Sequence, residues 1–366
     1  MNLVQRTDAM ARPLRILIVR RDNIGDLVCT TPLIAGLRSA YKNAWIGVLA
    51  NTYNAPVLEN NPDIDRVYAY RKTKHGGMNW FRTASERLRL IAGLRRQALD
   101  YAIVATPAHR DRGLRMARLA GAKHVIAFVR PGASTRGIDS PVLLQNTGDA
   151  HEVELVWGLA QALGIEGVPP PCKVVVSPEI LSSVQAAVAQ HLRNAAGPLV
   201  GIHLSARLPS QRWPAARFSA VMKELHRKED ACFMLFWAPG DESNPQHPGD
   251  DAKAQEVIQA TRHLPVLAWP THDLRELIGG IAACERLLLA DGGAMHIAAA
   301  LAKPIVALFG DSDTQRWRPW GTECEILQAK TRHVTAISVQ AVVGAFDRLG
   351  SRLAPDHRAL PSPKSP

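Results

Sequence analysis

The chain has 366 residues, of which 46% are hydrophobic and 21% are charged, and these values are ordinary for a globular protein. Its length predicts two domains, because single hydrophobic cores stop growing at about 250–300 residues. No apolar run approaches the ~20 residues of a membrane-spanning helix, and the N-terminus lacks the pattern of a signal peptide.

Lysine and arginine outnumber aspartate and glutamate by 44 to 33, which gives a net charge of +11. This excess favours an anionic partner. Nucleic acid is not expected, because the sequence has no helix-turn-helix, zinc-finger or RNA-binding signature. The five cysteines form no C-x-x-C pair, which indicates a reducing compartment and argues against a structural zinc. We therefore expect a cytoplasmic protein.

The first half of the chain alternates short apolar runs with helical patterns. Strands are predicted at residues 15–20, 45–50, 66–70, 101–106 and 125–129. A turn is predicted at 22–26, and helices at 27–41, 54–60, 79–97, 110–120 and 152–163. A loop rich in Gly, Ser and Pro is predicted at 131–147. The alternation predicts a parallel sheet with helices on both faces.

The second half repeats this rhythm after a boundary placed between Pro171 and Pro198. Strands are predicted at 199–204, 232–237, 266–269, 286–290, 305–309 and 325–327, and helices at 215–227, 252–260, 274–283 and 339–349. We therefore expect an α/β protein with two doubly wound, Rossmann-like domains, over residues 14–175 and 185–350. A disordered tail is expected over residues 353–366.

Two glycines, Gly292 and Gly293, follow the predicted strand 286–290 and precede a short helix of small residues. Glycine lets the backbone turn tightly and lets a ligand approach it closely. The N-terminus of the helix offers free N–H groups and the positive end of the helix dipole, which suit a phosphate or diphosphate. A plain strand–helix turn, with glycine required only by geometry, is the alternative.

Three blocks of the sequence resemble the glycosyltransferase family 9 heptosyltransferases. They are residues 15–32 (RILIVRRDNIGDLVCTTP), 61–67 (NPDIDRV) and 291–310, which WRPWG at 317–321 extends. The blocks lie in both halves and in the family's order. The resemblance implies a GT-B fold, in which an acceptor domain and a donor domain face each other across a cleft. It also implies inverting, metal-independent transfer of heptose from ADP-heptose to the growing lipopolysaccharide core.

Asp26 resembles the family's catalytic base and is the residue we expect to carry the chemistry. It follows the first strand, at the edge where open α/β sheets bind their ligands. A carboxylate there can take the proton of an acceptor hydroxyl that attacks the anomeric carbon. Capping of a helix that begins at Leu27 is the structural alternative. Asn23, Gly25 and Thr31 are expected on the acceptor side of the cleft.

The second-half block is expected to bind the donor. Asp291 resembles the family's aspartate that contacts the donor, and His296 resembles its histidine near the phosphates, with a half-buried structural histidine as the alternative. Fixed donors stabilise a leaving group that gains negative charge. The residues expected to supply or surround these donors are Gly292, Gly293, Ala294, Met295 and His296.

A loop of the expected donor site contains the clearest departure from the family. The family usually has a lysine that contacts donor phosphate, and this chain has Gln211 instead. Arg212 or Arg207 can supply the missing charge, although arginine is not equivalent to lysine. Ser205 is expected to contact the donor as well. Glu242 resembles a family glutamate near the ribose, with a solvated loop acid as the alternative.

No metal or other cofactor is expected. The triplet Asp311-Ser312-Asp313 resembles the D-x-D motif that binds Mn²⁺ in other glycosyltransferases, but it lies where the family has a loop without metal. The helix at 79–97 carries arginines and an apolar stripe (Trp80, Ala84, Leu88 and Ile91). The stripe indicates core packing, with contact to the cytoplasmic face of the inner membrane as the alternative. The arginines suit the anionic glycolipid acceptor that the resemblance implies.

Other functions are compatible with the same residues. A family member can use another donor sugar or another acceptor. Because Gln211 replaces the usual lysine, a sugar-nucleotide-binding protein that has lost catalysis is an alternative. A GT-B epimerase, which needs no acceptor, is another.

Overall fold

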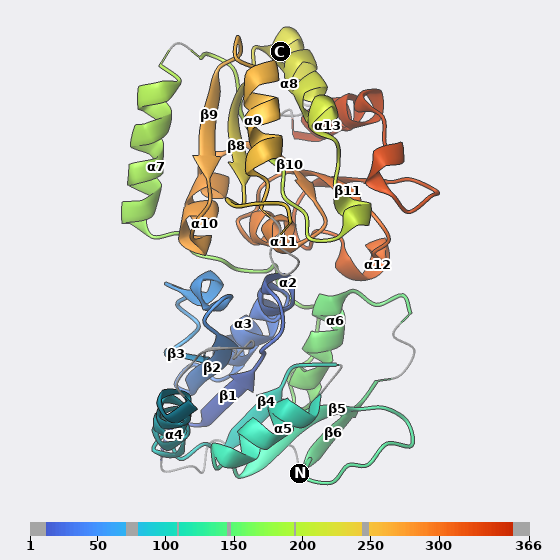
Figure 1. Ribbon diagram of the computed structural model, residues 1–366. Helices are drawn as coiled ribbons and strands as arrows, with labels where there is room; N and C mark the ends of the chain where they lie inside the picture. The colour runs from blue at the N-terminus through green and yellow to red at the C-terminus, as the bar shows by residue number, and fades with distance from the viewer. Residues whose placement is uncertain are drawn as a thin grey trace, which may run out of the picture.

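The chain folds around two six-stranded parallel sheets (Figure 1), in a computed structural model that describes residues 12–70, 80–107, 110–144, 148–193, 195–243 and 249–353. The first sheet has the order β3-β2-β1-β4-β5-β6, and the second has the order β12-β11-β10-β7-β8-β9. Each therefore has the Rossmann order 3-2-1-4-5-6 when its strands are numbered within their own half. The prediction of two Rossmann-like halves is confirmed.

The N-terminal sheet has nearly continuous apolar strands at its centre, as expected for strands with helices on both faces. Its strands are β1 (Arg15–Val19), β2 (Trp45–Asn51), β3 (Arg66–Tyr70), β4 (Tyr101–Val104), β5 (His124–Val129) and β6 (Ser140–Leu143). Its helices are α2 (Ile24–Val28), α3 (Thr31–Ala40), η1 (Ala55–Leu58), α4 (Trp80–Arg95), α5 (Arg110–Leu119), α6 (Glu152–Trp157) and η2 (Gly158–Leu163).

The C-terminal sheet is built in the same way. Its strands are β7 (Leu199–His203), β8 (Cys232–Trp237), β9 (Val266–Pro270), β10 (Arg286–Ala290), β11 (Ile305–Phe309) and β12 (Cys324–Gln328). The helices around it are α7 (Pro178–His191), η3 (Pro209–Gln211), α8 (Ala215–Glu229), α9 (Asp251–Ala260), α10 (Leu274–Ala283), α11 (Gly293–Ala300), α12 (Thr314–Trp317), η4 (Val334–Ala336) and α13 (Val339–Leu353).

The segment after β1 differs from the prediction of a turn followed by one long helix. Asn23 caps α2, and Asp26 is the third residue of that helix, where its carboxylate accepts from the Asn23 backbone N–H in a capping box. A second helix, α3, begins at Thr31. Pro32 has no N–H to donate to the preceding turn, so one continuous helix would lack a backbone bond there.

Strand β6, helices α7 and α12, and the short 3-10 helices η3 and η4 were not predicted. The edge strand β6 lies inside the stretch predicted as a loop, and Pro141 is tolerated in it because an edge strand needs fewer ladder bonds. Helix α7 lies where the domain boundary was placed, and it packs against α10 of the C-terminal half. In Figure 1, α7 stands beside the second sheet, apart from the N-terminal half.

Helix α4 matches the predicted amphipathic helix only in part. Leu90, Ile91 and Leu94 pack on the core beneath it, but Leu88 is exposed. The side chain of Trp80 and residues 354–366 of the expected tail lie outside the described residues.

The two halves meet where α2 contacts α11 (Figure 1). Leu27 and Val28 of α2 belong to the same buried apolar cluster as Met295 and Ile297 of α11. This cluster joins the two halves directly beneath the polar residues that follow β1 and β10. The packing therefore fixes the position of the first helix of one half against the glycine-rich helix of the other.

Candidate functional site

A cleft of about 920 Å³ lies between the two halves. Its lining includes residues that follow β1, β7 and β10. Strands β7 and β10 flank the point where the second sheet reverses its order, and β1 is one of the two strands at that point in the first sheet. Open α/β sheets bind ligands at this position. The predicted site residues that line the cleft are Asn23, Gly25, Asp26, Ser205, Arg207, Gln211, Asp291, Gly292, Gly293, Ala294 and His296.

Glycines permit the close approach of the halves at the base of the cleft. A Cβ atom at Gly25 would lie 2.6 Å from Cδ2 of His296, and one at Gly293 would lie 2.9 Å from Cβ of Ile24. Real Cβ atoms essentially never come within 3.0 Å of another heavy atom. Both glycines are therefore required for α2 and α11 to meet as they do.

Asp26 lines the cleft, and each oxygen of its carboxylate accepts one hydrogen bond. Its Oδ1 accepts from Nη2 of Arg20 at 2.6 Å, and its Oδ2 accepts from the Asn23 N–H at 3.0 Å. Burial alone would raise the pKa of Asp26, but the Arg20 charge and these hydrogen bonds outweigh burial and lower it. Asp26 is therefore ionised at neutral pH. A carboxylate has about four lone-pair sites, so it can still accept a bond from a substrate hydroxyl.

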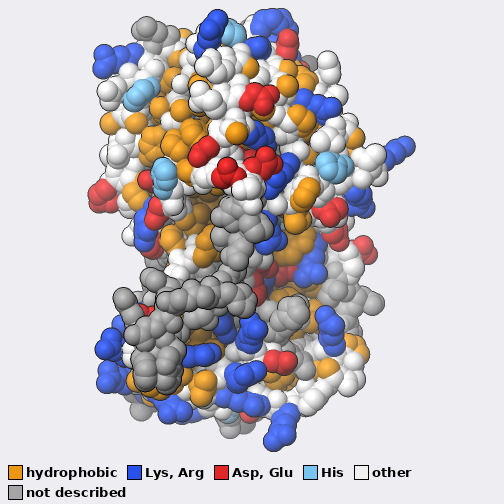
Figure 2. All heavy atoms as spheres, viewed as in Figure 1, with side chains coloured by type: hydrophobic (Ala, Val, Ile, Leu, Met, Phe, Trp, Pro, Cys, Tyr) orange, Lys and Arg blue, Asp and Glu red, His pale blue; other side chains and the backbone are white. Residues whose placement is uncertain are grey.

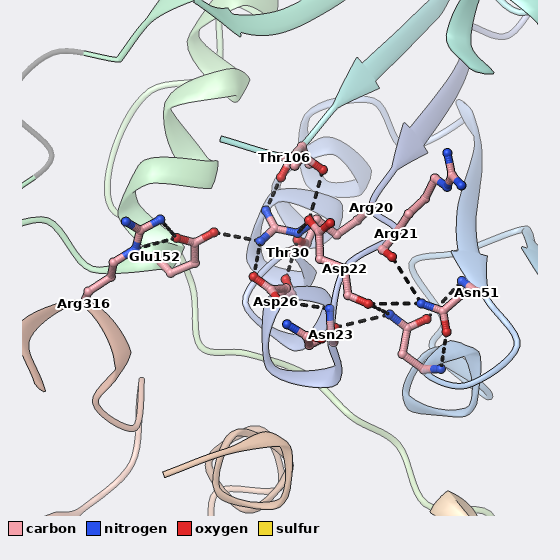
Figure 3. A network of polar contacts seen from close by, with 12 residues as sticks. Arg20, Arg21, Asp22, Asn23, Asp26, Thr30, Asn51, Thr106, Glu152 and Arg316 are labelled. Carbon is pink, nitrogen blue, oxygen red and sulfur yellow. Dashed lines mark hydrogen bonds and ion pairs between the residues drawn. The ribbon is translucent and has the colours of Figure 1, made fainter. Parts of the chain in front are cut away.

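Arg20, which follows β1, is the buried cation behind Asp26 (Figure 3). It also pairs with Asp22 at 3.2 Å and with Glu152 at 2.8 Å, and it donates to the carbonyl of Ala105. Burial lowers the pKa of Arg20, but the three carboxylates have the larger, opposite effect. The pKa is therefore raised, and the guanidinium stays charged. This role was not predicted, and its only signal in the sequence is a charged residue at the end of a buried strand.

The N-terminus of α11 faces the cleft from the other half. Gly292 occupies the N-cap position with φ 157°, a region that side-chain-bearing residues rarely adopt. Gly292 has no side chain to cap this helix, so its first backbone N–H groups lack a cap at Gly293 and Ala294, which line the cleft. They form a site with the polarity that a diphosphate requires.

Gln211, at which the resemblance implies a lysine in the family, brings no charge to the cleft. The amide is buried and donates to Oδ2 of Asp291 at 2.9 Å and to Oγ of Ser312 at 3.1 Å. Burial raises the pKa of Asp291, and the hydrogen bond from Ser312 offsets only part of that effect. A neutral amide thus holds a carboxylate where a cation would have paired with it.

Arg207 and Arg212 lie in different environments. Arg212 is bound to Glu242 at 2.7 Å and to the Ala206 carbonyl at 3.2 Å, and neither Arg212 nor Glu242 lines the cleft. Arg207 lines the cleft, and no hydrogen bond or ion pair ties its guanidinium to another described residue. Ser205 uses its hydroxyl to accept from the Ala238 N–H at 2.8 Å.

His296 lies at the base of the cleft with its ring buried, and its Nδ1 is 3.7 Å from Sγ of Cys29. Burial lowers the pKa of His296, but Cys29 and the carboxylates of Asp291 and Asp26 outweigh it and raise the pKa.

Besides Arg212 and Glu242, two more of the predicted site residues, Thr31 and Met295, do not line the cleft. Thr31 is buried, and its hydroxyl donates to Val28 O at 2.7 Å and accepts from the Lys173 N–H at 2.9 Å. Met295 is buried in the apolar cluster between α2 and α11. Both residues shape the junction between the halves without facing the ligand space.

The D-x-D-like triplet has structural contacts. Asp311 accepts from the Ser210 hydroxyl at 2.7 Å, and Asp313 caps α12. In the part of the chain that the structure describes, no three His, Cys, Asp or Glu side chains are grouped as metal ligands.

Two Arg–Glu pairs connect the halves on either side of the cleft, and neither was predicted. Arg316 of α12 binds Oε2 of Glu152 through Nη2 at 2.7 Å and Nε at 3.0 Å. Arg275 of α10 makes a two-pronged contact with Glu59, at 2.5 and 2.7 Å. Each pair joins residues more than 160 positions apart, so only the fold brings them together.

The N-terminal half carries many exposed cations. Figure 2 shows Lys and Arg side chains scattered over the half that holds the first sheet. Exposed arginines of this half include Arg87, Arg89, Arg95, Arg112, Arg115 and Arg118 on α4 and α5. Among the described helices, none is both long and apolar enough to cross a membrane.

Known proteins share both the sequence pattern and the fold. Residues 87–343 match the family described as glycosyltransferase family 9 (heptosyltransferase). The lipopolysaccharide heptosyltransferase 3 of Escherichia coli is 26% identical over 309 residues, which cover 81% of this chain and 83% of that protein.

Two solved structures share the GT-B fold. The glycosyltransferase family 9 structure from Veillonella parvula has a TM-score of 0.76 at 18% identity, covering 93% of this chain and 98% of that one. The E. coli ADP-heptose lipopolysaccharide heptosyltransferase II has a TM-score of 0.73 at 21% identity, covering 93% and 99%. The chain is therefore a glycosyltransferase of GT-B fold, and it belongs to glycosyltransferase family 9, the heptosyltransferase family.

Proposed function

We propose that this enzyme transfers heptose from ADP-heptose to a lipopolysaccharide core acceptor, with inversion and without a metal, and that Asp26 is the general base. The observation that carries the proposal is the placement of Asp26 in the same cleft as the free N-terminus of α11. The names of two relatives support the choice of substrates, since one is a lipopolysaccharide heptosyltransferase and the other an ADP-heptose enzyme.

Asp26 would act on the acceptor hydroxyl. Its lowered pKa makes it a weak base, so it accepts the proton only late, when the acceptor oxygen is already bonding to the anomeric carbon and its proton has become acidic. The bond from that oxygen forms as the bond to the ADP oxygen breaks. Attack from the side of Asp26, opposite the α11 N-terminus, inverts the configuration of the sugar.

The donor half would stabilise the departing ADP. The N–H groups at Gly293 and Ala294, the imidazole of His296 and the guanidinium of Arg207 converge on the cleft. Preorganised donors of this kind are usually the largest catalytic contribution. Arg207 replaces the charge that Gln211 lacks, since Arg212 is already held by Glu242.

The test is a transfer assay with ADP-heptose and truncated lipopolysaccharide from strains that lack heptosyltransferase 2 or 3. We expect a heptosylated product of inverted configuration, formed equally well in the presence of EDTA. Loss of activity with EDTA would contradict the metal-free mechanism. Turnover only with another nucleotide sugar would contradict ADP-heptose as the donor. ADP binding without transfer to either acceptor would contradict the lipopolysaccharide core as the acceptor.

A further inference from the structure

Glu152 is a fully buried carboxylate that bridges the two halves of the enzyme (Figure 3). Its Oε1 accepts from Nη2 of Arg20 at 2.8 Å, and its Oε2 accepts from Arg316 at 2.7 and 3.0 Å. Arg20 belongs to the N-terminal half, and Arg316 comes from α12 of the C-terminal half. Glu152 therefore has one cation from each half, one on each of its oxygens.

The same Arg20 nitrogen holds Asp26. Nη2 donates to Oδ1 of Asp26 at 2.6 Å and to Oε1 of Glu152 at 2.8 Å. Two carboxylates thus accept from one nitrogen, which has two N–H groups, and they compete for the positive charge of Arg20. Arg316 relieves this competition, because it neutralises Glu152 from the far side.

Glu152 and Arg316 lie on two segments that pack against each other where the halves meet. Glu152 is the first residue of α6, which is capped by His151. His151 stacks on Trp320 with ring centroids 4.7 Å apart and contacts the carbonyl of Arg318. The start of α6 is therefore docked on the 316–320 segment, and Glu152 meets Arg316 only when the halves are together.

We propose that Glu152 and Arg316 are positioning residues that hold Asp26 oriented and ionised through Arg20, and that they do so only when the two halves are docked. The inference rests on the proposed function of Asp26 as the base. It assigns a task to a buried ion-pair network outside the cleft, since neither Arg316 nor Glu152 lines it.

The electrostatic consequence has a definite sign. The charged groups around Asp26 come from the end of β1, from α6, α11 and α12, and they are Arg20, Asp22, Glu152, His296 and Arg316. Removal of Arg316 leaves the Glu152 charge without its second partner. Glu152 then attracts Arg20 more strongly, so the pKa of Asp26 rises and the carboxylate is held less firmly.

The experiment compares kcat at pH 5 and pH 7.5 for Arg316→Gln, with ADP-heptose and truncated lipopolysaccharide as substrates. We expect kcat at pH 7.5 to fall by about tenfold, because small misplacements of a reacting group are costly. The ratio of kcat at pH 5 to kcat at pH 7.5 should fall below that of wild type, because a larger part of Asp26 is protonated at pH 5. The Kd for ADP should stay within about twofold of wild type. Arg316→Lys should restore the ratio.

Arg275→Gln is the matched control. It also removes an arginine that joins the halves through a glutamate, but Glu59 has no contact with Arg20 or Asp26. Its pH ratio should equal that of wild type, even if its turnover changes. Arg316 is 32% exposed, so its variants should fold, whereas Glu152→Gln removes one partner of a buried pair and is used only if ADP binding shows it folded.

An unchanged pH ratio in Arg316→Gln would overturn the inference, whether or not kcat falls. A shift of the same size in Arg275→Gln would show that the ratio does not depend on the Arg316–Glu152 contact in particular, and it would also overturn the inference. Near-wild-type turnover by Asp26→Asn would instead remove the proposed base, an outcome that this comparison distinguishes from failure of the Arg316 link.

Discussion

Gly25 and His296 lie so close that a Cβ atom at position 25 would be 2.6 Å from the imidazole ring. One residue precedes the proposed base and the other lies on the helix proposed to bind the leaving group. The contact therefore sets the spacing between the two chemical functions of the cleft. The spacing depends on the absence of a side chain at position 25, which is why the glycine precedes Asp26.

Gly25→Ala should lower turnover by about tenfold or more, since the added methyl group must push α2 away from α11. Stability should fall by about 1–3 kcal/mol, as for other overpacked sites. Gly158→Ala is the control, because it adds the same methyl group at a helical position with no atom within 4 Å. Steady-state kinetics and urea unfolding measure both effects. Wild-type turnover in Gly25→Ala would show that the spacing is not critical.

Arg207→Gln should weaken ADP binding by about tenfold or more, because a charge-assisted hydrogen bond contributes about 1.5–3 kcal/mol. Arg212→Gln should change the Kd by less than about twofold, since this guanidinium is bound to Glu242. Isothermal titration calorimetry with ADP compares the two variants under identical conditions. A larger effect at Arg212 would reverse the assignment of the phosphate-binding arginine.

We expect the protein to lose stability in mild acid because of His151. Its Nδ1 accepts from the Val153 N–H and its Nε2 donates to Arg318 O, so the ring is neutral in the folded state. Burial lowers its pKa from 6.5 to about 4. The folded state then binds a proton less tightly than the unfolded state. The stabilisation is fully present above pH 6.5 and is lost as the pH falls toward 4.

Between pH 7.5 and pH 5 this histidine should cost about 2 kcal/mol of unfolding free energy. Urea unfolding at both pH values measures the loss, and His151→Asn serves as the reference that cannot titrate. The difference between wild type and the variant should shrink or reverse at pH 5. The same difference at both pH values would show that His151 is protonated without penalty.

The sequence predicts the two sheets well, because a buried parallel strand is a short apolar run wherever it occurs, as in 15–19 and 305–309. Helix α7 was missed although Ser177, Pro178 and Glu179 form a recognisable helix start: the serine hydroxyl caps the Ile180 N–H at 3.2 Å. Strand β6 was missed because its pattern lies among Gly, Ser and Pro residues and includes Pro141.

The site was predictable only where a residue follows a strand end or a glycine turn, as Asp26 and Gly293 do. The residues that contact Asp26 could not be predicted in this way. Glu152 is 132 positions from Arg20 and 164 from Arg316, and nothing in its local sequence distinguishes it from a solvated helix-start glutamate. Burial and charge sharing are properties of the folded interface, so they become visible only when the halves are placed together.

Asp26→Asn tests the central claim most directly, because it removes the charge and basicity of the side chain while keeping its size. The measurement is kcat for transfer from ADP-heptose to truncated lipopolysaccharide, alongside the Kd for ADP from calorimetry. If Asp26 is the general base, kcat of Asp26→Asn should be about 10²–10⁴-fold lower than that of wild type, and its affinity for ADP should be nearly unchanged. Turnover within a few-fold of wild type, by a variant that still binds ADP, would contradict the assignment of Asp26 as the base.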